Sequence, residues 1–487
     1  TYMDLDTSVR LGILFVEASG APQTPDIIVP TDVIKNNNTL YFIYGDSNYY
    51  TSLDDLNGLK SAKLTAVNTI EATIRGVSSV SADNFTIKDS SDATITVSSA
   101  TISGSTATII LSGADIKKAP FSVTFKGVTV SALPIPELID EHFLYDGGDV
   151  GLTFSGTSIT FKTWAPLASD VKLLIYNDAA AVTNKTISGE PIQMERGDKG
   201  IWFYTSTDSS LNGKYYKYRI KNGSQTAEVA DIWSYAASPD SVASQIVDIK
   251  DGWESYTNPF TGDYTDAVIY EMHIRDWAKA FGGKGKFSEL TAELVPSGRF
   301  AEHLKDLGIT HVQILPAFDY AQPNSDTAYN WGYNPYHYNV PEGRYVKDMV
   351  DGTDAVEQFR ALINAFHNQG IAVIMDVVYN HTAGTGVNSL YDMTVPEYFY
   401  RLNADGSYSN GSGCGNEIAT NHKMVAKFVI ESLKHWMIDY HINGFRFDLM
   451  GCHEKSFMKE VYNALYEIDN KVMIYGEPWT GGTALTI

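Results

Sequence analysis

The stretch Ile371-Ala-Val-Ile-Met-Asp-Val-Val-Tyr-Asn-His381 carries the clearest fold signal in the chain. It begins as an apolar run with the length of one buried strand, and Asp376, Asn380 and His381 place polar groups toward its end. The segment before it, residues 355–366, has apolar residues at helical spacing. A helix that leads into a buried strand is the repeating unit of α/β proteins.

Four more segments in the second half of the chain follow the same pattern. Each is a short apolar run with polar or charged residues at its carboxyl end, and they cover 268–273, 311–316, 444–448 and 472–477. A second helical pattern spans residues 423–440. Polar residues at the carboxyl ends of successive strands are typical of a parallel barrel whose site lies on the upper face. We predict the N-terminal part of a (β/α)8 TIM barrel, which is incomplete because only five strands are apparent.

The first half of the chain has the texture of antiparallel β structure. Alternating apolar and polar residues, separated by clusters of Gly, Asn, Asp and Ser, predict strands at 39–44, 85–88, 93–97, 107–111, 121–125, 158–166, 171–176, 202–204 and 214–220. Short strands at regular spacing favour β-sandwiches. The predicted fold class is therefore multidomain, with N-terminal β-sandwich modules followed by the incomplete α/β barrel.

A chain of 487 residues is long enough for three or four domains. We predict a β region at 1–60, an Ig-like β-sandwich at 61–132, a second β-sandwich at 133–257 and the barrel at 258–487. Leu133-Pro-Ile-Pro136 is predicted to be a stiff linker because of its two prolines.

The charge of the chain restricts its partners. With 36 basic and 58 acidic residues the net charge is −22, so nucleic acids and anionic membranes would be repelled. No apolar run approaches the roughly 18 residues that span a bilayer. We therefore expect no nucleic acid partner, no membrane insertion and a monomer.

Two smaller features are predicted to be structural. Cys414 and Cys452 lie outside any metal-type spacing and are predicted to be free thiols. The glycine-rich segment Gly282-Gly-Lys-Gly-Lys286 lacks the Gly-Lys-Ser/Thr ending of a phosphate loop. We predict an ordinary loop after the first barrel strand.

Two acidic residues at strand ends, Asp448 and Glu477, indicate a chemical function. A pair of carboxylates delivered from strand ends into one cleft is what glycosidic bond cleavage requires. Arg446 lies two residues before Asp448, on the same side of the strand, and its guanidinium would lower the pKa of that carboxyl. The structural alternatives are an Arg–Asp pair that closes a barrel end and a solvated glutamate at the rim.

Several motifs resemble those of one known family. The α-amylase superfamily, glycoside hydrolase family 13, has three signature regions similar to Asp376-Val-Val-Tyr-Asn-His381, Gly444-Phe-Arg-Phe-Asp448 and Tyr475-Gly-Glu-Pro-Trp479. Type I pullulanases of this superfamily carry a heptapeptide that resembles Tyr329-Asn-Trp-Gly-Tyr-Asn-Pro335, although Asn334 replaces the usual Asp and so lacks its charge. Gly413-Cys-Gly-Asn-Glu417 is similar to a further pullulanase segment.

The resemblance extends to the β modules. Phe161-Lys-Thr-Trp-Ala-Pro166 resembles the starch-associated, early-set β-sandwich that precedes the barrel in this family, which assigns residues 133–257 to such a module. Residues 1–60 resemble the end of a glucan-binding module.

The resemblance implies roles for the acidic pair and its neighbours. Asp448 matches the catalytic nucleophile, which forms a covalent glycosyl-enzyme, and Glu477 matches the general acid/base. Glu477 must then carry a proton at the working pH, which apolar neighbours such as Trp479 and the charge of Asp448 would favour. Both roles together imply a retaining mechanism with the two carboxyl groups about 5–5.5 Å apart. Asp376 is expected to brace Arg446.

The remaining site residues are also carried over from the family motifs. His381 matches a histidine that hydrogen bonds the sugar, and Tyr333 matches an aromatic ring that stacks under it. The expected substrate-binding set is Tyr333, His381, Arg446, Trp331 and Trp479. Asn380 matches a position that binds calcium in many amylases, and a loop-capping role is equally open. No cofactor is required, while a structural calcium ion remains open.

The resemblance implies a debranching enzyme that hydrolyses α-1,6-glucosidic bonds in pullulan, amylopectin, glycogen and limit dextrins. An amylase–pullulanase of mixed α-1,4 and α-1,6 specificity is an alternative within the enzyme class. A glucan-binding protein without turnover is the alternative from another class.

The family uses a third carboxylate, from a His-Asp motif that follows the general acid in the sequence. No such residue follows Glu477, so we expect a piece of a longer protein that lacks both ends and is inactive alone. The modular composition suits an extracellular or cell-surface bacterial enzyme.

Overall fold

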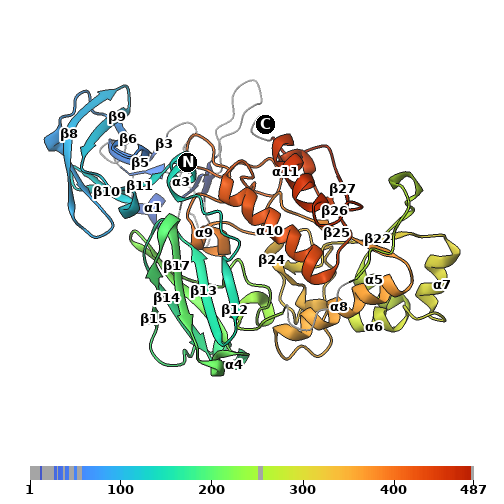
Figure 1. Ribbon diagram of the computed structural model, residues 1–487. Helices are drawn as coiled ribbons and strands as arrows, with labels where there is room; N and C mark the ends of the chain where they lie inside the picture. Colours follow the sequence, from blue (N-terminus) through green and yellow to red (C-terminus); the bar gives the residue numbers. More distant parts are fainter. Residues whose placement is uncertain are drawn as a thin grey trace, which may run out of the picture. The chain divides into compact units, whose positions relative to one another are not determined.

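The computed structural model describes residues 11–13, 27–29, 31–36, 39–42, 49–51, 57–249 and 256–483 (Figure 1). The chain divides into two compact units, Thr1–Leu138 and Ile139–Ile487. The division falls within helix α3 (Pro136–Phe143) and not at the predicted boundary after residue 132.

Seven strands of the first unit form a closed barrel in the order β10-β11-β5-β6-β9-β8-β7. Their bounds are β5 (Gly58–Ala66), β6 (Thr69–Arg75), β7 (Phe85–Lys88), β8 (Thr94–Ser103), β9 (Thr106–Ser112), β10 (Phe121–Phe125) and β11 (Val128–Pro134). The prediction of an Ig-like sandwich at 61–132 is wrong, because β10 pairs with both β7 and β11 and so closes the ring of strands.

The region before this barrel is described only in short pieces. Its elements are β1 (Leu11–Ile13), β2 (Ile27–Val29), α1 (Thr31–Asn36), β3 (Tyr41–Phe42) and β4 (Tyr49–Tyr50). β3 covers residues 41–42 of the predicted strand at 39–44, while residues 39–40 are not in a strand and residues 43–44 lie outside the described residues. Strand β5 crosses the predicted boundary at residue 60, so the first predicted domain is too long by three residues.

The predicted linker at 133–136 is wrong. Leu133 and Pro134 end strand β11, where they pair in parallel with Lys63 and Leu64 of β5, and Pro136 begins α3. Among the described residues, Pro134 of β11 pairs only with β5, since the pairing of β11 with β10 stops at Ala132. The missing N–H of a proline is tolerated at such a position.

The second unit begins with two antiparallel sheets, β12-β13-β17-β16 and β15-β14-β18-β19, with β20 added to β18. Phe161 of the first sheet contacts Tyr216 of the second edge-on at 5.1 Å between ring centroids, so the two sheets face each other. This arrangement confirms the predicted sandwich. The strands are β12 (Gly151–Ser155), β13 (Ser158–Trp164), β14 (Ala168–Tyr176), β15 (Ile192–Gln193), β16 (Glu195–Arg196), β17 (Ile201–Ser206), β18 (Tyr215–Asn222), β19 (Gln225–Val229) and β20 (Ser244–Gln245).

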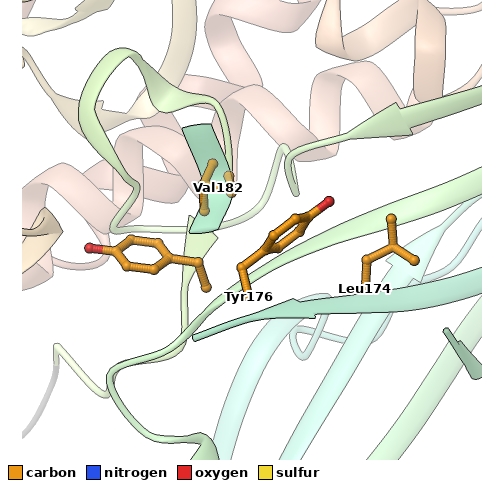
Figure 2. Packing of buried hydrophobic residues seen from close by; sticks show 5 residues of the cluster. Leu174, Tyr176 and Val182 are labelled. Atoms are coloured by element: carbon orange, nitrogen blue, oxygen red, sulfur yellow. The ribbon is translucent and has the colours of Figure 1, made fainter. Parts of the chain in front are cut away.

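A small apolar cluster closes one end of this sandwich. Leu174 and Tyr176 of β14 are buried with Val182 of helix α4 (Ala179–Thr183), as Figure 2 shows. Tyr215 and Ala243 complete the cluster. The cluster therefore packs α4 onto the second sheet.

The rest of the second unit contains a parallel sheet of five strands in chain order, β21-β22-β25-β26-β27. The strands are β21 (Ile269–Met272), β22 (His311–Ile314), β25 (Ala372–Val377), β26 (Gly444–Phe447) and β27 (Met473–Gly476), which confirms all five predicted segments. Tyr475 of β27 donates from its hydroxyl to Gln313 of β22 at 2.6 Å. Because two strands lie between them, the sheet must be strongly curved, as in part of a barrel.

Helices connect the parallel strands. The helices are α5 (Ile274–Ala280), α6 (Phe287–Ala292), α7 (Arg299–Asp306), α8 (Gly352–Asn368), α9 (Leu390–Thr394), α10 (Lys423–Tyr440) and α11 (Lys455–Tyr466). The predicted helices at 355–366 and 423–440 correspond to α8 and α10. An antiparallel pair, β23 (Phe318–Tyr320) and β24 (Pro335–Pro341), projects between β22 and α8. In the described part of the chain no helix is long and apolar enough to cross a membrane.

Aromatic side chains join the sandwich to the β/α domain. The ring centroids of Trp164 and Tyr398 lie 5.1 Å apart, and those of Trp233 and Phe428 of α10 lie 4.9 Å apart in an edge-on contact. The Trp164 indole N–H also donates to the carbonyl of Phe143 at 2.9 Å. The sandwich and the β/α domain therefore share one buried aromatic interface.

Replacing Trp164 with alanine tests this interface. The ring is 1% exposed, so we expect a loss of about 3–5 kcal/mol, seen as a lower midpoint of urea unfolding. Trp331→Ala is the matched control, because Trp331 is 58% exposed and its removal should change stability by no more than about 0.5 kcal/mol. Equal midpoints for the two variants would contradict the interface.

Candidate active site

Three neighbouring strands deliver the site residues. Asp376 of β25, Arg446 of β26 and Tyr475 of β27 are partners in register, so their side chains leave the sheet on the same side. Asp448 and Glu477 follow the last two strands directly. Their backbone N–H groups donate to the carbonyls of the preceding strands at 3.0 and 3.1 Å, which fixes where each carboxylate begins.

The Arg446 guanidinium joins three carboxylates. It donates to both oxygens of Asp376 at 3.0 and 3.1 Å and to Asp448 at 3.2 Å, and its other terminal nitrogen pairs with Glu477. The expected support of Arg446 by Asp376 is confirmed, and the two predicted catalytic carboxylates contact the same cation. The sequence motifs therefore meet at one point in the structure.

Asp376 lies at the base of this cluster with a fully buried side chain. Burial raises its pKa to about 7, although Arg446 and the hydroxyl of Tyr333, which donates at 2.7 Å, favour the carboxylate. Asp376 thus positions Arg446 and Tyr333.

Asp448 is held by a residue whose role the sequence left open. The Asn380 side-chain amide donates to the backbone carbonyl of Asp448 at 2.8 Å and to its carboxylate at 2.9 Å. Burial raises the pKa of Asp448, while Asn380 and Arg446 act in the opposite direction. The expectation that Arg446 lowers the pKa of Asp448 is confirmed as one of the contributions, although burial outweighs it and the pKa is raised overall.

Glu477 is held by charge and by the backbone. One carboxylate oxygen pairs with Arg446 and the other accepts the backbone N–H of Leu449 at 3.1 Å. Trp479, at 56% exposure, leaves its side chain largely in solvent. The apolar setting near Trp479 stays a prediction, while the partners of Glu477 described here are Arg446 and the backbone of Leu449.

Leu449 has an unusual backbone conformation for a leucine. Its φ of 42° and ψ of 49° are left-handed, which costs a residue with a side chain roughly 1–2 kcal/mol. This turn follows Asp448 directly and aims the Leu449 N–H at Glu477. Strained backbone of this kind clusters at functional sites, and no sequence pattern indicated it.

Tyr333 and His381 lie beside the carboxylate cluster. Tyr333 is half-buried, with its hydroxyl fixed on Asp376. His381 is 3% exposed, with Nδ1 2.6 Å from the side-chain oxygen of Asn380. Burial lowers the pKa of His381 to about 4, so the ring is neutral at neutral pH. Trp331 stands exposed on the same loop as Tyr333.

The asparagine at position 334 fits its surroundings as an amide. Its nitrogen donates to the carbonyl of Ala321 at 3.2 Å, and its oxygen accepts from Asn330 at 3.1 Å. A carboxylate could not make the first contact, because it has no proton to donate at neutral pH. Asn334 therefore closes the loop that carries Trp331 and Tyr333.

Asn380 takes part in the hydrogen bonding of the carboxylate cluster. Both ends of its side chain are engaged, with Asp448 and with His381. In the parts of the chain that the structure describes, no group of three or more His, Cys, Asp or Glu side chains could hold a metal ion. Cys414 and Cys452 are free thiols, as predicted.

Arg401 and Glu417 form a buried support that sequence reasoning missed. Arg401 pairs with Glu417 and donates to the carbonyl of Cys452 at 2.8 Å, just after the turn at Leu449. Asn416, the neighbour of Glu417, bonds the backbone of Thr382 at both its N–H and its carbonyl. The motif at 413–417 thus supports the loops after β25 and β26.

The carboxylates of the cluster outnumber its cation. Asp376, Asp448 and Glu477 around one guanidinium carry two net negative charges when all are ionised. A proton bound by Asp376 would relieve this repulsion. The raised pKa of Asp376 is consistent with one proton held near neutral pH.

Comparison with known proteins agrees with this architecture. Residues 149–234 match carbohydrate-binding module 48 (isoamylase N-terminal domain), and residues 301–399 match the α-amylase catalytic domain. A pullulanase of Bacillus subtilis is 33% identical over 360 residues, which cover 71% of this chain and 48% of that protein. The chain thus spans about half the length of this relative.

Solved structures show the same similarity. The pullulanase from Bacillus acidopullulyticus matches with a TM-score of 0.77 at 28% identity, over 88% of this chain and 68% of that chain. The pullulanase from Anoxybacillus sp. LM18-11 complexed with maltotriose matches with a TM-score of 0.74 at 32% identity, over 88% and 63%.

A carbohydrate-binding sandwich followed by a parallel β/α domain with carboxylates at its strand ends defines the α-amylase class of glycoside hydrolases. The chain groups with the glycoside hydrolases of family 13, and the relatives that it matches within that family are named pullulanases.

Replacing Asn380 with aspartate tests the clamp on Asp448. The change removes two donated hydrogen bonds and sets a second carboxylate against Asp448, so we expect a loss of about 1–3 kcal/mol at pH 8. The new carboxyl would have a raised pKa in the folded protein. The loss of stability in the variant is therefore complete above that pKa and becomes smaller as the pH falls. Urea unfolding at pH 8 and pH 5 measures both effects.

Asn212→Asp is the control, since it adds the same charge at an exposed position. Its effect should stay within about 0.5 kcal/mol at both pH values. If Asn380→Asp lost the same unfolding free energy at both pH values, no carboxylate repulsion would act on Asp448.

Proposed function

We propose that the protein is a retaining glycoside hydrolase that cleaves α-1,6-glucosidic linkages in pullulan, amylopectin, glycogen and limit dextrins. The observation that carries this proposal is the contact of Asp448 and Glu477 with one guanidinium, from the ends of adjacent strands. Two carboxylates that reach the same cation are close enough for a nucleophile and an acid to act on one bond. The similarity to proteins named pullulanases supports the choice of linkage.

In the first step Asp448 attacks the anomeric carbon while Glu477 gives its proton to the departing glycosidic oxygen. The bond between that carbon and that oxygen breaks, and a covalent glycosyl-enzyme forms on Asp448. Glu477 then removes a proton from water, which attacks the same carbon and releases Asp448. Two inversions restore the original anomeric configuration.

The shared cation connects these steps. Glu477 can act as an acid only when it is protonated, and a neutral carboxyl interacts more weakly with Arg446 than a carboxylate does. The guanidinium is then left to Asp376 and Asp448, which favours the ionised nucleophile. One guanidinium thus couples the proton on Glu477 to the charge on Asp448.

The surrounding side chains suit sugar binding. Tyr333 offers an aromatic ring whose position is fixed by its bond to Asp376, and Trp331 and Trp479 expose large aromatic surfaces. His381, neutral because burial lowers its pKa to about 4, can hydrogen bond a hydroxyl without adding charge. An extracellular or cell-surface location would bring such a site to polymeric glucan.

The reaction test uses the full-length protein with pullulan, amylopectin and amylose. We expect reducing ends from pullulan, and losses of at least about 10³-fold in kcat for Asp448→Asn and Glu477→Gln. Nuclear magnetic resonance of the first product should detect the α-anomer before mutarotation. Release from amylose alone would refute the linkage, and tight glucan binding with no release would indicate a binding protein.

The pH profile tests the state of Asp448. The nucleophile must be ionised, so kcat/KM should fall as pH drops through its pKa, which burial raises above the ordinary value of about 3.9. Asn380→Ala removes a hydrogen bond that lowers this pKa, so its acidic limb should move to higher pH. Asn334→Ala is the control, because it changes the loop without contacting Asp448. An unmoved limb in Asn380→Ala would contradict this role of Asn380.

A further inference from the structure

A second pocket of about 370 Å³ lies beside the loop that carries the site aromatics. It is formed by helix α5, by the glycine-rich segment after it and by the residues between β23 and the turn after β24. Five basic side chains and one acidic side chain face it: Arg275, Lys279, Lys284, Lys286, Arg344 and Asp326. This concentration of positive charge is unexpected in a chain whose net charge is −22.

The positive charge of the pocket is not neutralised by ion pairs. Within the described residues, none of the five basic side chains approaches a carboxylate to ion-pair distance. The nearby Glu289 accepts three successive backbone N–H groups of the glycine-rich segment at 2.8–2.9 Å. Glu342 is fully buried, accepts the backbone N–H groups of Tyr320 and Arg344 at 3.2 and 2.6 Å, and is not among the residues that line the pocket.

The five basic side chains differ in how many of their N–H groups are still available to donate to a ligand. Arg344 is saturated, since its N–H groups donate to the carbonyls of Asp326 and Ala328, to the Tyr320 hydroxyl and to Gln322. It supplies a fixed charge at the base. Lys286 donates once, to the Arg344 carbonyl at 2.7 Å, and so keeps two N–H groups.

The outer cations are freer. Arg275 uses one N–H on the Thr327 carbonyl at 3.0 Å and keeps further donors. Lys279 and Lys284 are exposed, and no hydrogen bond from either ammonium group appears among the described residues. Open donors above a buried fixed charge suit an anion that has several acceptor oxygens.

The segment that presents these side chains is held in shape. Gly285 has a φ of +97°, and a Cβ there would lie 2.8 Å from the Arg275 side chain, so glycine lets the two segments pack. Glu289 occupies the backbone N–H groups that would otherwise bind an anion. Any anion must therefore bind through side chains and not in the manner of a phosphate loop.

The pocket adjoins the candidate active site through one loop. The guanidinium of Arg275 lies 5.0 Å from the ring centroid of Tyr329, which is 50% exposed. Four residues later Tyr333 bonds Asp376 in the carboxylate cluster. A glucan chain that passes over this loop would meet both sites.

We infer that this pocket binds a phosphate monoester carried by the α-glucan. The volume of about 370 Å³ holds a sugar ring as well as a phosphate, and neutral glucan alone would leave the five basic side chains with only Asp326 as an acidic neighbour in the pocket lining. This inference rests on the proposed action on α-glucans for the source of the phosphate, whereas the anion site itself depends only on the pocket.

The first experiment measures binding of inorganic phosphate and of glucose 6-phosphate to the full-length protein by calorimetry at low salt. The variant Lys279→Gln/Lys284→Gln should bind both about tenfold more weakly, because two charge-assisted contacts are lost. The matched control Lys305→Gln/Lys459→Gln makes the same charge change at exposed positions elsewhere and should bind as the unmodified protein does. No phosphate binding, or equal weakening in both variants, would overturn the anion site.

The second experiment compares binding of phosphorylated amylopectin with binding of the same polymer after phosphatase treatment. We expect several-fold tighter binding of the phosphorylated polymer, a preference that only the Lys279→Gln/Lys284→Gln variant loses. Phosphate binding without this preference would overturn the glucan as its source and leave a site for free phosphate. Because both readouts are binding, a protein that hydrolyses no glucan would refute the proposed reaction without deciding the fate of the phosphate site.

Discussion

The ion cluster around Arg446 is the interaction on which the candidate site depends. Three carboxylates from three neighbouring strands converge on one guanidinium, and that of Asp376 is completely buried. Burying charge in this way is costly, and a hydrophobic core of the same size is often as stable or more stable. The cluster is better explained by what it arranges than by stability, since it fixes two carboxylates at one point above the sheet.

The loops above the sheet are built around this cluster. The left-handed turn at Leu449 directs a backbone N–H to Glu477, and Asn380 holds Asp448 from the opposite side. Beneath them Arg401 ties the turn after β26 to Glu417. Each loop therefore has a specific polar contact that limits how far the carboxylates can move, which a reaction between fixed atoms requires.

The sequence was most informative where structure is local. Buried parallel strands are continuous apolar runs, so all five strands were found, and polar residues at their ends identified Asp448 and Glu477. The seven-strand barrel was mistaken for a sandwich because the pairing that closes it joins β10 to β7, far apart in the sequence. Pro134 was misread because its tolerance in β11 depends on a neighbouring strand that ends earlier. The surroundings of Glu477 likewise depend on Arg446 in another strand.

The properties of the acidic groups could not be read from the motifs because they arise from the whole cluster. A motif places an arginine beside an aspartate and suggests a lowered pKa, yet burial outweighs the guanidinium and raises the pKa of Asp448. With three carboxylates on one cation, a proton taken by any of them changes the charge felt by the other two. Asp448 and Glu477 are thus not electrostatically independent, because both contact the same guanidinium. The guanidinium of Arg446 is the group through which the protonation of one determines the charge of the other.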